Sequence, residues 1–448
     1  MSKKSYVVGE DAIYDAKQLS KPKLLILGLQ HVFAMFGATV LVPMLTGLSI
    51  STTLLMAGLG TLLFHLVTKG KVPAFLGSSF AFITGYSLVA PQIRQMLANG
   101  NEVLLPNTEE LPYACGGVLI AGLVYVILAG LIKLFGVNRV MRFFPPVVTG
   151  PIIIAIGLIL APTAIDNCKK DWLLALIALT AIIICNIWGK GMVKIVPIMI
   201  GIVVSYVVAL CLGKIDFTGV KDASFFEIPL HTTAFAKFRF DAIVTIVPIA
   251  LATMMEHIGD ISAIGATTGK NYIKDPGLHR TLIGDGLATS LSSFFGGPAN
   301  TTYGENTGVL ALTKVFTPVV MQIASVIAII LSFFPIVEEI IRSIPAAIIG
   351  GISLILYGMI SAIGIRNVVE NQVDFTKSRN LIISAVILVS AIGFNSIGGI
   401  TFFIKDVKIS LSGLAIAALA GIILNAILPG NDYVFDKKEQ HDELTFKV

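Results

Sequence analysis

The chain has 448 residues, of which 55% are hydrophobic and 13% charged, with a mean hydropathy of +0.87 and a formal net charge of +5. Soluble domains carry about 25% charged residues, so this composition excludes a soluble globular protein and indicates a chain embedded in a lipid bilayer. The lysines and arginines are spread over loops, so no nucleic-acid partner is predicted, and the four cysteines lack the CxxC spacing of a metal site.

The hydropathy pattern predicts an all-α polytopic membrane protein with fourteen spans. A helix needs about 20 residues to cross a bilayer, and apolar segments are centred near residues 33, 58, 83, 124, 155, 180, 203, 255, 288, 306, 327, 354, 391 and 419. No apolar stretch precedes the first long span, so no cleaved signal peptide is predicted. If the N-terminus is inside, most of the 32 lysines and arginines fall in the cytoplasmic loops and the two tails. This bias predicts a plasma-membrane protein (bacterial inner membrane) with both termini cytoplasmic.

Three landmarks occur twice in the same order. "LQHVFAMFGA" (29–38) corresponds to "MEHIGDISAIGA" (255–266), "FLGSSFAF" (75–82) to "FFGGPANTTYGE" (294–305), and "RFFPPVVTGPIIIAIG" (142–157) to "RSIPAAIIGGISLILYG" (342–358). An odd number of spans in each half turns the second half upside down in the membrane. The landmarks therefore predict two inverted repeats of seven spans, as in secondary transporters. The alternative is that glycine and proline recur by chance in apolar chains.

Spans three and ten are interrupted by polar, helix-breaking segments. Pro298 cannot continue a helix, and the residues that follow it favour extended backbone. We therefore expect a short strand over 296–303 and a half-helix beginning near Glu305, with an equivalent strand over 77–82. Non-helical backbone at membrane depth requires partners. Two such strands can pair antiparallel near the midplane, which leaves the N–H groups of both half-helices free for a ligand.

Acidic side chains in these spans are the strongest candidates for function. An acid at the bilayer centre costs roughly 2.5–3.5 kcal/mol, and Glu256 and Glu305 both lie in long apolar surroundings. Asp260 is four residues after Glu256 and shares its helix face, whereas His257 points about 100° away. The alternatives are that Glu256 only bonds a neighbouring helix, that Glu305 only caps a helix, and that Asp260 lies near the cytoplasmic boundary.

Two histidines have both structural and functional interpretations. His257 is expected to be a packed or interfacial residue, and His31, midway through the first span, either supports the fold or orients a group of the site. No zinc-protease, dinucleotide or nucleophile motif is present, and "GATTGKN" (265–271) is too short between its glycines for a phosphate loop. The sequence therefore predicts neither an enzyme nor a metal or organic cofactor.

The segment from Glu305 to Lys314, "ENTGVLALTK", carries a resemblance to a known family. It matches the pattern of Gln, Glu or Pro, then Asn-x-Gly, four residues, and Thr followed by Arg, Lys or Gly, through Asn306, Gly308 and Thr313. With "LQHVFAMFGATVLVP" (29–43), "PAFLGSSFAFI" (73–83), "EHIGD" (256–260), "DPGLHR" (275–280) and "PANTTYGEN" (298–306), the chain resembles the nucleobase–ascorbate transporter family of nucleobase–cation symporters.

The resemblance implies a division of the chain into two domains. The core domain comprises residues 23–135 and 242–340, and the gate domain comprises residues 136–213 and 341–430. An extracellular loop over 214–241 and cytoplasmic tails over 1–22 and 431–448 complete the chain, and a homodimer is expected to form through the gate domains.

By the same resemblance, the substrate lies between core and gate. Side chains of Glu256 and Glu305 and backbone amides of Phe80 and Gly304 would hold it. Tyr303, Phe80 and Ala38 would form apolar walls, with His31 nearby. Some members have histidine where this chain has Asp260, which puts a proton relay at that position in doubt.

These features predict a uracil importer driven by proton symport, in which the core moves against the gate. Glu256 and Asp260 are the candidates for proton coupling, with H⁺ as the coupling ion. Glu305 favours uracil because xanthine permeases of the family more often have glutamine there. A xanthine or urate permease, an anion exchanger of the same architecture, and a non-transporting membrane enzyme or receptor are the alternatives.

Overall fold

The computed structural model describes residues 12–96, 102–404 and 407–431. The first half of the chain forms long helices over its apolar runs, although Pro43, Pro151 and Pro162 lie inside two of them, and it has one interruption before residue 83. Its main helices are α1 (Lys21–Thr46), α2 (Ile50–Val67), α3 (Ile83–Val89), α4 (Leu111–Phe135), α6 (Pro146–Cys168), α7 (Trp172–Trp188) and α9 (Pro197–Cys211). Short helices α5 (Val137–Met141), α8 (Met192–Ile195) and α10 (Thr218–Asp222) lie in the connections.

The second half repeats this alternation of long and interrupted helices. Its main helices are α11 (Phe240–Ile246), α12 (Ile249–Thr268), α13 (Leu278–Phe294), α14 (Gly304–Thr313), α15 (Val319–Ser332), α17 (Ala346–Glu370), α18 (Ser378–Ser396) and α19 (Gly413–Ile427), with the short α16 (Pro335–Arg342) between α15 and α17. Each of the predicted span centres falls in one of these helices or at its start.

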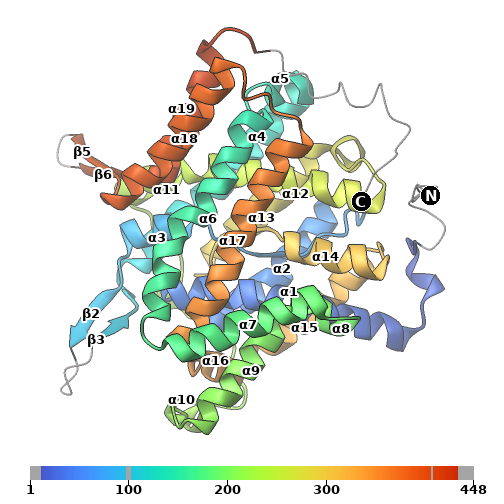
Figure 1. The fold of residues 1–448 in the computed structure, drawn as a ribbon, viewed down its shortest axis with the longest axis vertical. Helices are drawn as coiled ribbons and strands as arrows, with labels where there is room; N and C mark the ends of the chain where they lie inside the picture. The colour runs from blue at the N-terminus through green and yellow to red at the C-terminus, as the bar shows by residue number, and fades with distance from the viewer. Residues whose placement is uncertain (1–11, 97–101, 405–406, 432–448) are drawn as a thin grey trace.

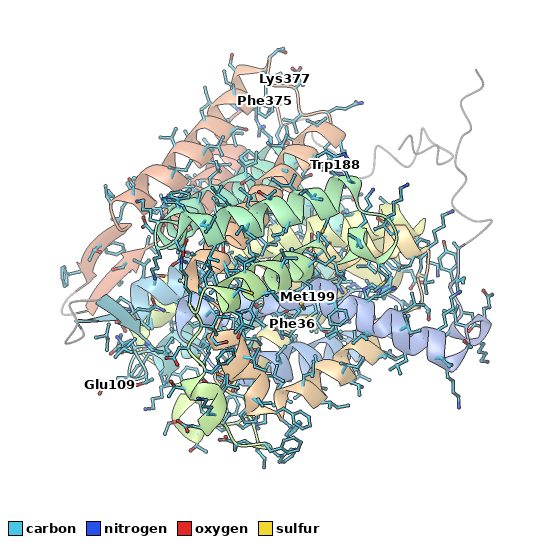
Figure 2. All side chains as sticks on the ribbon, turned by 60° about the horizontal axis from the view of Figure 1, so that its bottom comes forward. Phe36, Glu109, Trp188, Met199, Phe375 and Lys377 are labelled. Atoms are coloured by element: carbon cyan, nitrogen blue, oxygen red, sulfur yellow. The ribbon has the colours of Figure 1, made fainter. Side chains whose placement is uncertain are left out.

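Seven of the helices in the described part of the chain are long and apolar enough to cross a membrane, or eight if the bent pair α15–α16 forms one span. Helices α7, α9 and α19 are apolar but shorter. Exposed apolar side chains, such as that of Trp188 at the end of α7, cover the outside of the helices (Figure 2). Such continuous apolar surface is rare on soluble proteins. The fold is therefore that of a polytopic membrane protein, and the count of fourteen spans in inverted repeats stays a prediction.

The helices pack in two groups. Helix α2 packs on α15 and α13, α4 packs on α13, and α1 packs on α15, whereas α17 packs along α6 and α7 (Figure 1). Small residues allow the close approach of α6 and α17: a β-carbon on Gly157 would lie 2.2 Å from the carbonyl oxygen of Tyr357. Close backbone contact of this kind is typical of helix pairs in membranes. We call the two sets the α2 group (α1–α4 and α11–α15) and the α17 group (α6–α9 and α17–α19).

The described residues form three two-stranded antiparallel sheets. One joins β1 (Leu76–Ser78) to β4 (Asn300–Thr302). The others are hairpins, β2 (Ile93–Met96) with β3 (Glu102–Leu105) and β5 (Ile400–Ile404) with β6 (Val407–Leu411), which lie on the left of Figure 1. The sequence analysis did not predict these hairpins. Residues 400–411 are rich in β-branched and aromatic side chains, a composition that favours strands, but they lie between the apolar segments centred near residues 391 and 419, where no strand is predicted.

Candidate functional site

The β1–β4 pair brings together two segments that are far apart in the sequence. Gly77 lies opposite Thr301, and the ladder is extended by hydrogen bonds from Ser79 N to Ala299 O (2.8 Å) and from Tyr303 N to Phe75 O (3.0 Å). All six strand residues are buried. The two interruptions therefore satisfy each other's backbone groups, as buried extended backbone requires.

Each strand leads into a short helix. Helix α3 begins at Ile83 after β1, and α14 begins at Gly304 after β4. The first N–H groups of a helix lack intrahelical acceptors and form its positive end. Tyr303 makes no side-chain capping bond at the start of α14, and Glu305 lies in its first turn. The site thus has a carboxylate at a helix end whose first N–H groups have no side-chain cap.

Glu256 and Asp260 lie on α12, which packs against α14 and β4. Glu256 is close enough to Glu305 for the two to interact electrostatically, and its Oε2 atom is buried with no hydrogen-bond partner. Asp260 Oδ2 accepts a hydrogen bond from Thr302 Oγ1 (3.0 Å). Its Oδ1 lies 3.8 Å from the place that a β-carbon on Gly304 would occupy. Asp260 therefore lies beside the β1–β4 pair, deep in the fold.

His257 occupies the space between α12, α13 and β4. Its Nδ1 atom lies 3.3 Å from Asp285 Oδ2 and 3.4 Å from Thr302 Oγ1. The side chains of His257 and Asp285 are fully buried. Asp285 interacts electrostatically with Glu256 and with Asp260. The expected packed histidine is thus in contact with an acid of α13.

Asp285 is a further candidate site residue, which the sequence reasoning missed. It is the only charged residue between Arg280 and Glu305, so the criterion that selected Glu256 also selects Asp285. Together with Glu256, Asp260 and Glu305 it forms a cluster of four interacting acids. In the described part of the chain, no salt bridge joins any of these four to a lysine or arginine.

We expect Asp285→Asn to reduce transport of the substrate about tenfold, a change of about 1.4 kcal/mol, because the amide removes one charge from the acid cluster and from the contact with His257. The measurement is the initial rate of uptake by proteoliposomes. Ser290→Ala on the same helix is the matched control, since Ser290 donates only to Leu119 O. Uptake by Asp285→Asn equal to that of the unaltered protein would exclude Asp285 from the site.

His31 connects α1 to α14 through Asn306, a residue of the family pattern at residues 305–314. Asn306 Nδ2 donates to His31 Nδ1 (3.1 Å) and to His31 O (3.3 Å). Because Nδ1 accepts, a neutral His31 carries its proton on Nε2. His31 is buried and holds the first turn of α14 in place. Thr313, at the other end of α14, donates to Val309 O (2.9 Å) and lies away from the first turn.

The predicted apolar walls lie around β1. Tyr303 Oη donates to Ser78 O (3.0 Å) and lies within 3.3 Å of Thr39 Oγ1. A β-carbon on Gly77 would lie 2.4 Å from the Tyr303 ring, so only glycine allows this packing. Phe80 makes an edge-to-face contact with Tyr357 of α17 (ring centroids 5.8 Å apart). Ala38 is fully buried in α1.

A cavity of about 230 Å³ lies between the two helix groups. From the α2 group it is lined by Phe33, Ala34, Gly304, Glu305, Gly308, Val309 and Leu312; from the α17 group it is lined by Ile182, Asn186, Lys194, Val196, Pro197, Ile198, Met359, Ile360 and Ile363. Of the predicted site residues, the cavity contacts Gly304, Glu305 and Gly308. Glu256, Phe80, Tyr303, Ala38 and His31 do not line it. A β-carbon on Gly308 would meet no atom within 4 Å, so Gly308 keeps this space open.

Among residues 12–96, 102–404 and 407–431, no group of three or more histidine, cysteine, aspartate or glutamate side chains has a geometry that could hold a metal ion. The site instead offers carboxylate acceptors, helix-end N–H donors and aromatic faces next to an apolar cavity. Such a combination fits a small planar molecule with both hydrogen-bond donors and acceptors.

Two solved structures share this fold. The transmembrane domain of a cyanobacterium bicarbonate transporter, BicA, is similar with a TM-score of 0.61 at 15% sequence identity, over 90% of this chain and 96% of that chain. The murine Solute Carrier 26 family member A9 anion transporter in the inward-facing state is similar with a TM-score of 0.63 at 14% identity, over 92% of this chain and 69% of that chain. The chain therefore has a polytopic membrane fold that is found in transporters.

Sequence comparison identifies the family. The model of a permease family, Xan_ur_permease, matches residues 22–397. The chain is 43% identical to the uracil permease of Bacillus caldolyticus over 417 residues (90% of this chain and 91% of that protein) and 41% identical to the uracil permease of Bacillus subtilis over 431 residues (92% and 94%). It is 37% identical to the uracil permease of Escherichia coli K12 over 412 residues (90% of each). The chain belongs to this permease family, the nucleobase–ascorbate transporters, which confirms the resemblance found in the sequence; its relatives are permeases and not enzymes.

Proposed function

We propose that this protein imports uracil by proton symport across the bacterial plasma membrane, with both termini cytoplasmic. The observation that carries the proposal is the position of Glu305, in the first turn of α14 and at the wall of the cavity between the helix groups. The uracil permeases to which the chain is 37–43% identical support the choice of substrate.

The chemistry of the site matches the edge of a uracil ring. Uracil has two N–H donors and two carbonyl acceptors, and an unmatched polar group in a dry site costs about 1–3 kcal/mol. In the proposed complex, Glu305 accepts from one ring N–H group, and Glu256, which does not line the cavity in this structure, would accept from the other after the site rearranges around the substrate. The backbone amides of Phe80 and Gly304 donate to its carbonyl oxygens, and Phe80 and Tyr303 cover its faces.

Access to this site would alternate by movement of the core domain (residues 23–135 and 242–340) against the gate domain (residues 136–213 and 341–430). In support, the helices of these segments pack mainly on each other, and the cavity lies between the two sets. The β1–β4 pair lies wholly within the core segments. The core can therefore carry the site as one body, in the manner of an elevator.

Proton coupling is assigned to Glu256, with Asp260 as a second proton-binding group. Like charges close together disfavour their ionised forms, and interacting groups titrate together. The two acids interact with each other and with Glu305, so a proton at one of them changes the charge that the substrate meets. Coupling requires only that the protonated and substrate-bound states favour each other by about 1–3 kcal/mol.

The proposal is tested by uptake of radiolabelled uracil into proteoliposomes with and without an imposed pH gradient, acidic outside. We expect uracil to accumulate only with the gradient, and a protonophore to abolish the accumulation. Equal accumulation with and without the gradient would contradict proton coupling, and no uracil uptake under either condition would contradict the choice of substrate.

A xanthine or urate permease of the same family is the second candidate. Competition by excess unlabelled xanthine or urate in the same uptake assay distinguishes it, because only the preferred nucleobase blocks the signal at low concentration.

Anion exchange is less well supported: the two solved structures with this fold are a bicarbonate transporter and an anion transporter, but the acids of this site would repel an anion. A homodimer through the gate domains completes the proposal.

A further inference from the structure

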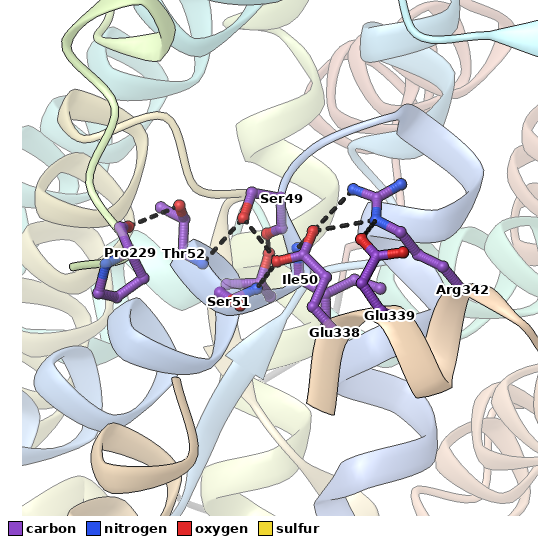
Figure 3. Close-up of polar contacts among 9 residues, drawn as sticks. Ser49, Ile50, Ser51, Thr52, Pro229, Glu338, Glu339 and Arg342 are labelled. Atoms are coloured by element: carbon purple, nitrogen blue, oxygen red, sulfur yellow. Dashed lines mark hydrogen bonds and ion pairs between the residues drawn. The ribbon is translucent and has the colours of Figure 1, made fainter. Parts of the chain in front are cut away.

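The first turn of α2 contacts both connections that pass between the two helix groups on one side of the protein (Figure 3). One is the loop connector, residues 212–239, which runs from α9 to α11. The other is the helical connector, residues 333–345, which contains α16 and runs from α15 to α17. Helix α15 and α16 meet at an angle of 86°. The chain therefore crosses between the groups twice at this corner.

Glu338 fixes the helical connector to α2. Its carboxylate accepts hydrogen bonds from Ile50 N (3.2 Å), Ser51 N (2.9 Å) and Ser49 Oγ (3.2 Å) at the start of α2. Arg342, one turn further along α16, donates to the same carboxylate from Nη2 (2.7 Å) and Nε (3.1 Å). A carboxylate at a helix N-terminus satisfies free N–H groups and interacts favourably with the helix dipole.

The loop connector is held at the same place. Thr52 Oγ1, in the same turn of α2, donates to Pro229 O (2.8 Å). The two connectors also contact each other: Glu227 N donates to Phe333 O (3.0 Å), and the rings of Phe226 and Phe333 are stacked with centroids 5.5 Å apart. The connectors and the start of α2 thus form one interlocked corner.

The bond from the helical connector to the α17 group is weaker. Tyr206 of α9 and Ser343 share one hydrogen bond between hydroxyl groups (2.7 Å). A single neutral bond is weaker than several bonds to a charged carboxylate. Pro345 follows and ends the helical hydrogen bonding between α16 and α17, which leaves residues 343–345 as the point where the chain can bend.

We propose that the first turn of α2 (Ser49–Thr52) is a clamp that keeps both connectors attached to the core, so that they travel with it and the chain bends at residues 343–345. This inference rests on the proposed movement of the core against the gate. Glu338 is then a positioning residue outside the substrate site. By holding α16 on α2, it makes α16 part of the moving core.

Cross-linking tests whether α16 moves with the core domain or stays with the gate domain. In a Cys211→Ser background, which removes the exposed cysteine and leaves the buried Cys115, Cys168 and Cys185, one variant carries Ser49→Cys with Glu338→Cys and the other carries Tyr206→Cys with Ser343→Cys. Each is bridged by a short bifunctional methanethiosulfonate, and uracil uptake is measured before bridging, after bridging and after reduction.

We expect the α2–α16 bridge to leave uptake unchanged and the α9–α16 bridge to abolish it until the bridge is reduced. The reverse pattern would overturn the proposal, as would loss of uptake from both bridges. If the Cys211→Ser protein, which carries neither cysteine pair, takes up no uracil, that result contradicts the proposed function and not the clamp.

A second measurement does not depend on transport. In Glu338→Gln, hydrogen–deuterium exchange of the amides in residues 335–343 and 49–52 should rise, whereas Glu339→Gln should leave it unchanged, because Glu339 is directed toward Gly219 of α10 and approaches Arg342 only to 3.9 Å. Unchanged exchange in Glu338→Gln would show that its carboxylate does not hold the corner together.

Discussion

Glu305→Ala is expected to weaken uracil binding by about 10- to 100-fold. A hydrogen bond to a charged group contributes about 1.5–3 kcal/mol, and each 1.4 kcal/mol is a tenfold change in affinity. Glu305 is the only acid among the residues that line the cavity. Its loss would leave a ring N–H of the substrate without an acceptor at the start of α14. The measurement is calorimetric titration of the purified protein with uracil.

Two variants sharpen this experiment. Glu305→Gln keeps the size and one acceptor oxygen of the side chain, so its affinity should fall between those of the unaltered protein and Glu305→Ala. Glu339→Gln removes a carboxylate that lies outside the site and should bind uracil normally. Normal binding by Glu305→Ala would remove the observation on which the proposed function depends.

Glu256→Gln should abolish the accumulation of uracil that a pH gradient drives. The amide cannot take up or release a proton, and the Oε2 atom of Glu256 is buried without a hydrogen-bond partner beside the other acids. Equilibrium binding should fall less, by about 10-fold or below, since a neutral hydrogen bond contributes about 0.5–1.5 kcal/mol. Accumulation ratios and binding constants measured on the same preparation separate the two effects.

Ser262→Ala is the control for Glu256→Gln. Ser262 lies on the same helix, donates only to Ile258 O (2.8 Å) and is outside the acid cluster. Gradient-driven accumulation should be normal in this control. If Glu256→Gln also accumulates uracil at the normal ratio, the proton is carried by another group of the cluster, and Asp260 and Asp285 become the candidates.

The sequence predicted the local structure of the candidate site where local chemistry determines it. Pro298 and the polar residues after it cannot form a buried helix, so a strand before Glu305 follows from the sequence alone, and the structure has β4 at 300–302. The acids stand out because so few charges occur in these spans. The signature from Glu305 to Lys314 gave the family, which the relatives confirm.

The remaining parts depend on contacts between segments that are distant in the sequence. The position of His257 against Asp285 depends on how α12 packs on α13, and hydrophobic periodicity does not specify that rotation. The orientation of the Tyr303 ring depends on the space left by Gly77, more than 200 residues earlier in the chain. The clamp at α2 has the same origin, because nothing around Glu338 in the sequence indicates that its acceptor groups meet Ser49 and Ser51.

The β1–β4 pair has a thermodynamic consequence for the proposed transporter. The strands that lead into the two half-helices are joined by backbone hydrogen bonds, so in the proposed mechanism the spacing of the groups that hold the ring would stay fixed while the core moves. Because this strand pair would neither form nor break during the movement, its free energy would be the same at both faces. The pair would then stabilise the core without adding to the energy barrier of the proposed transport step.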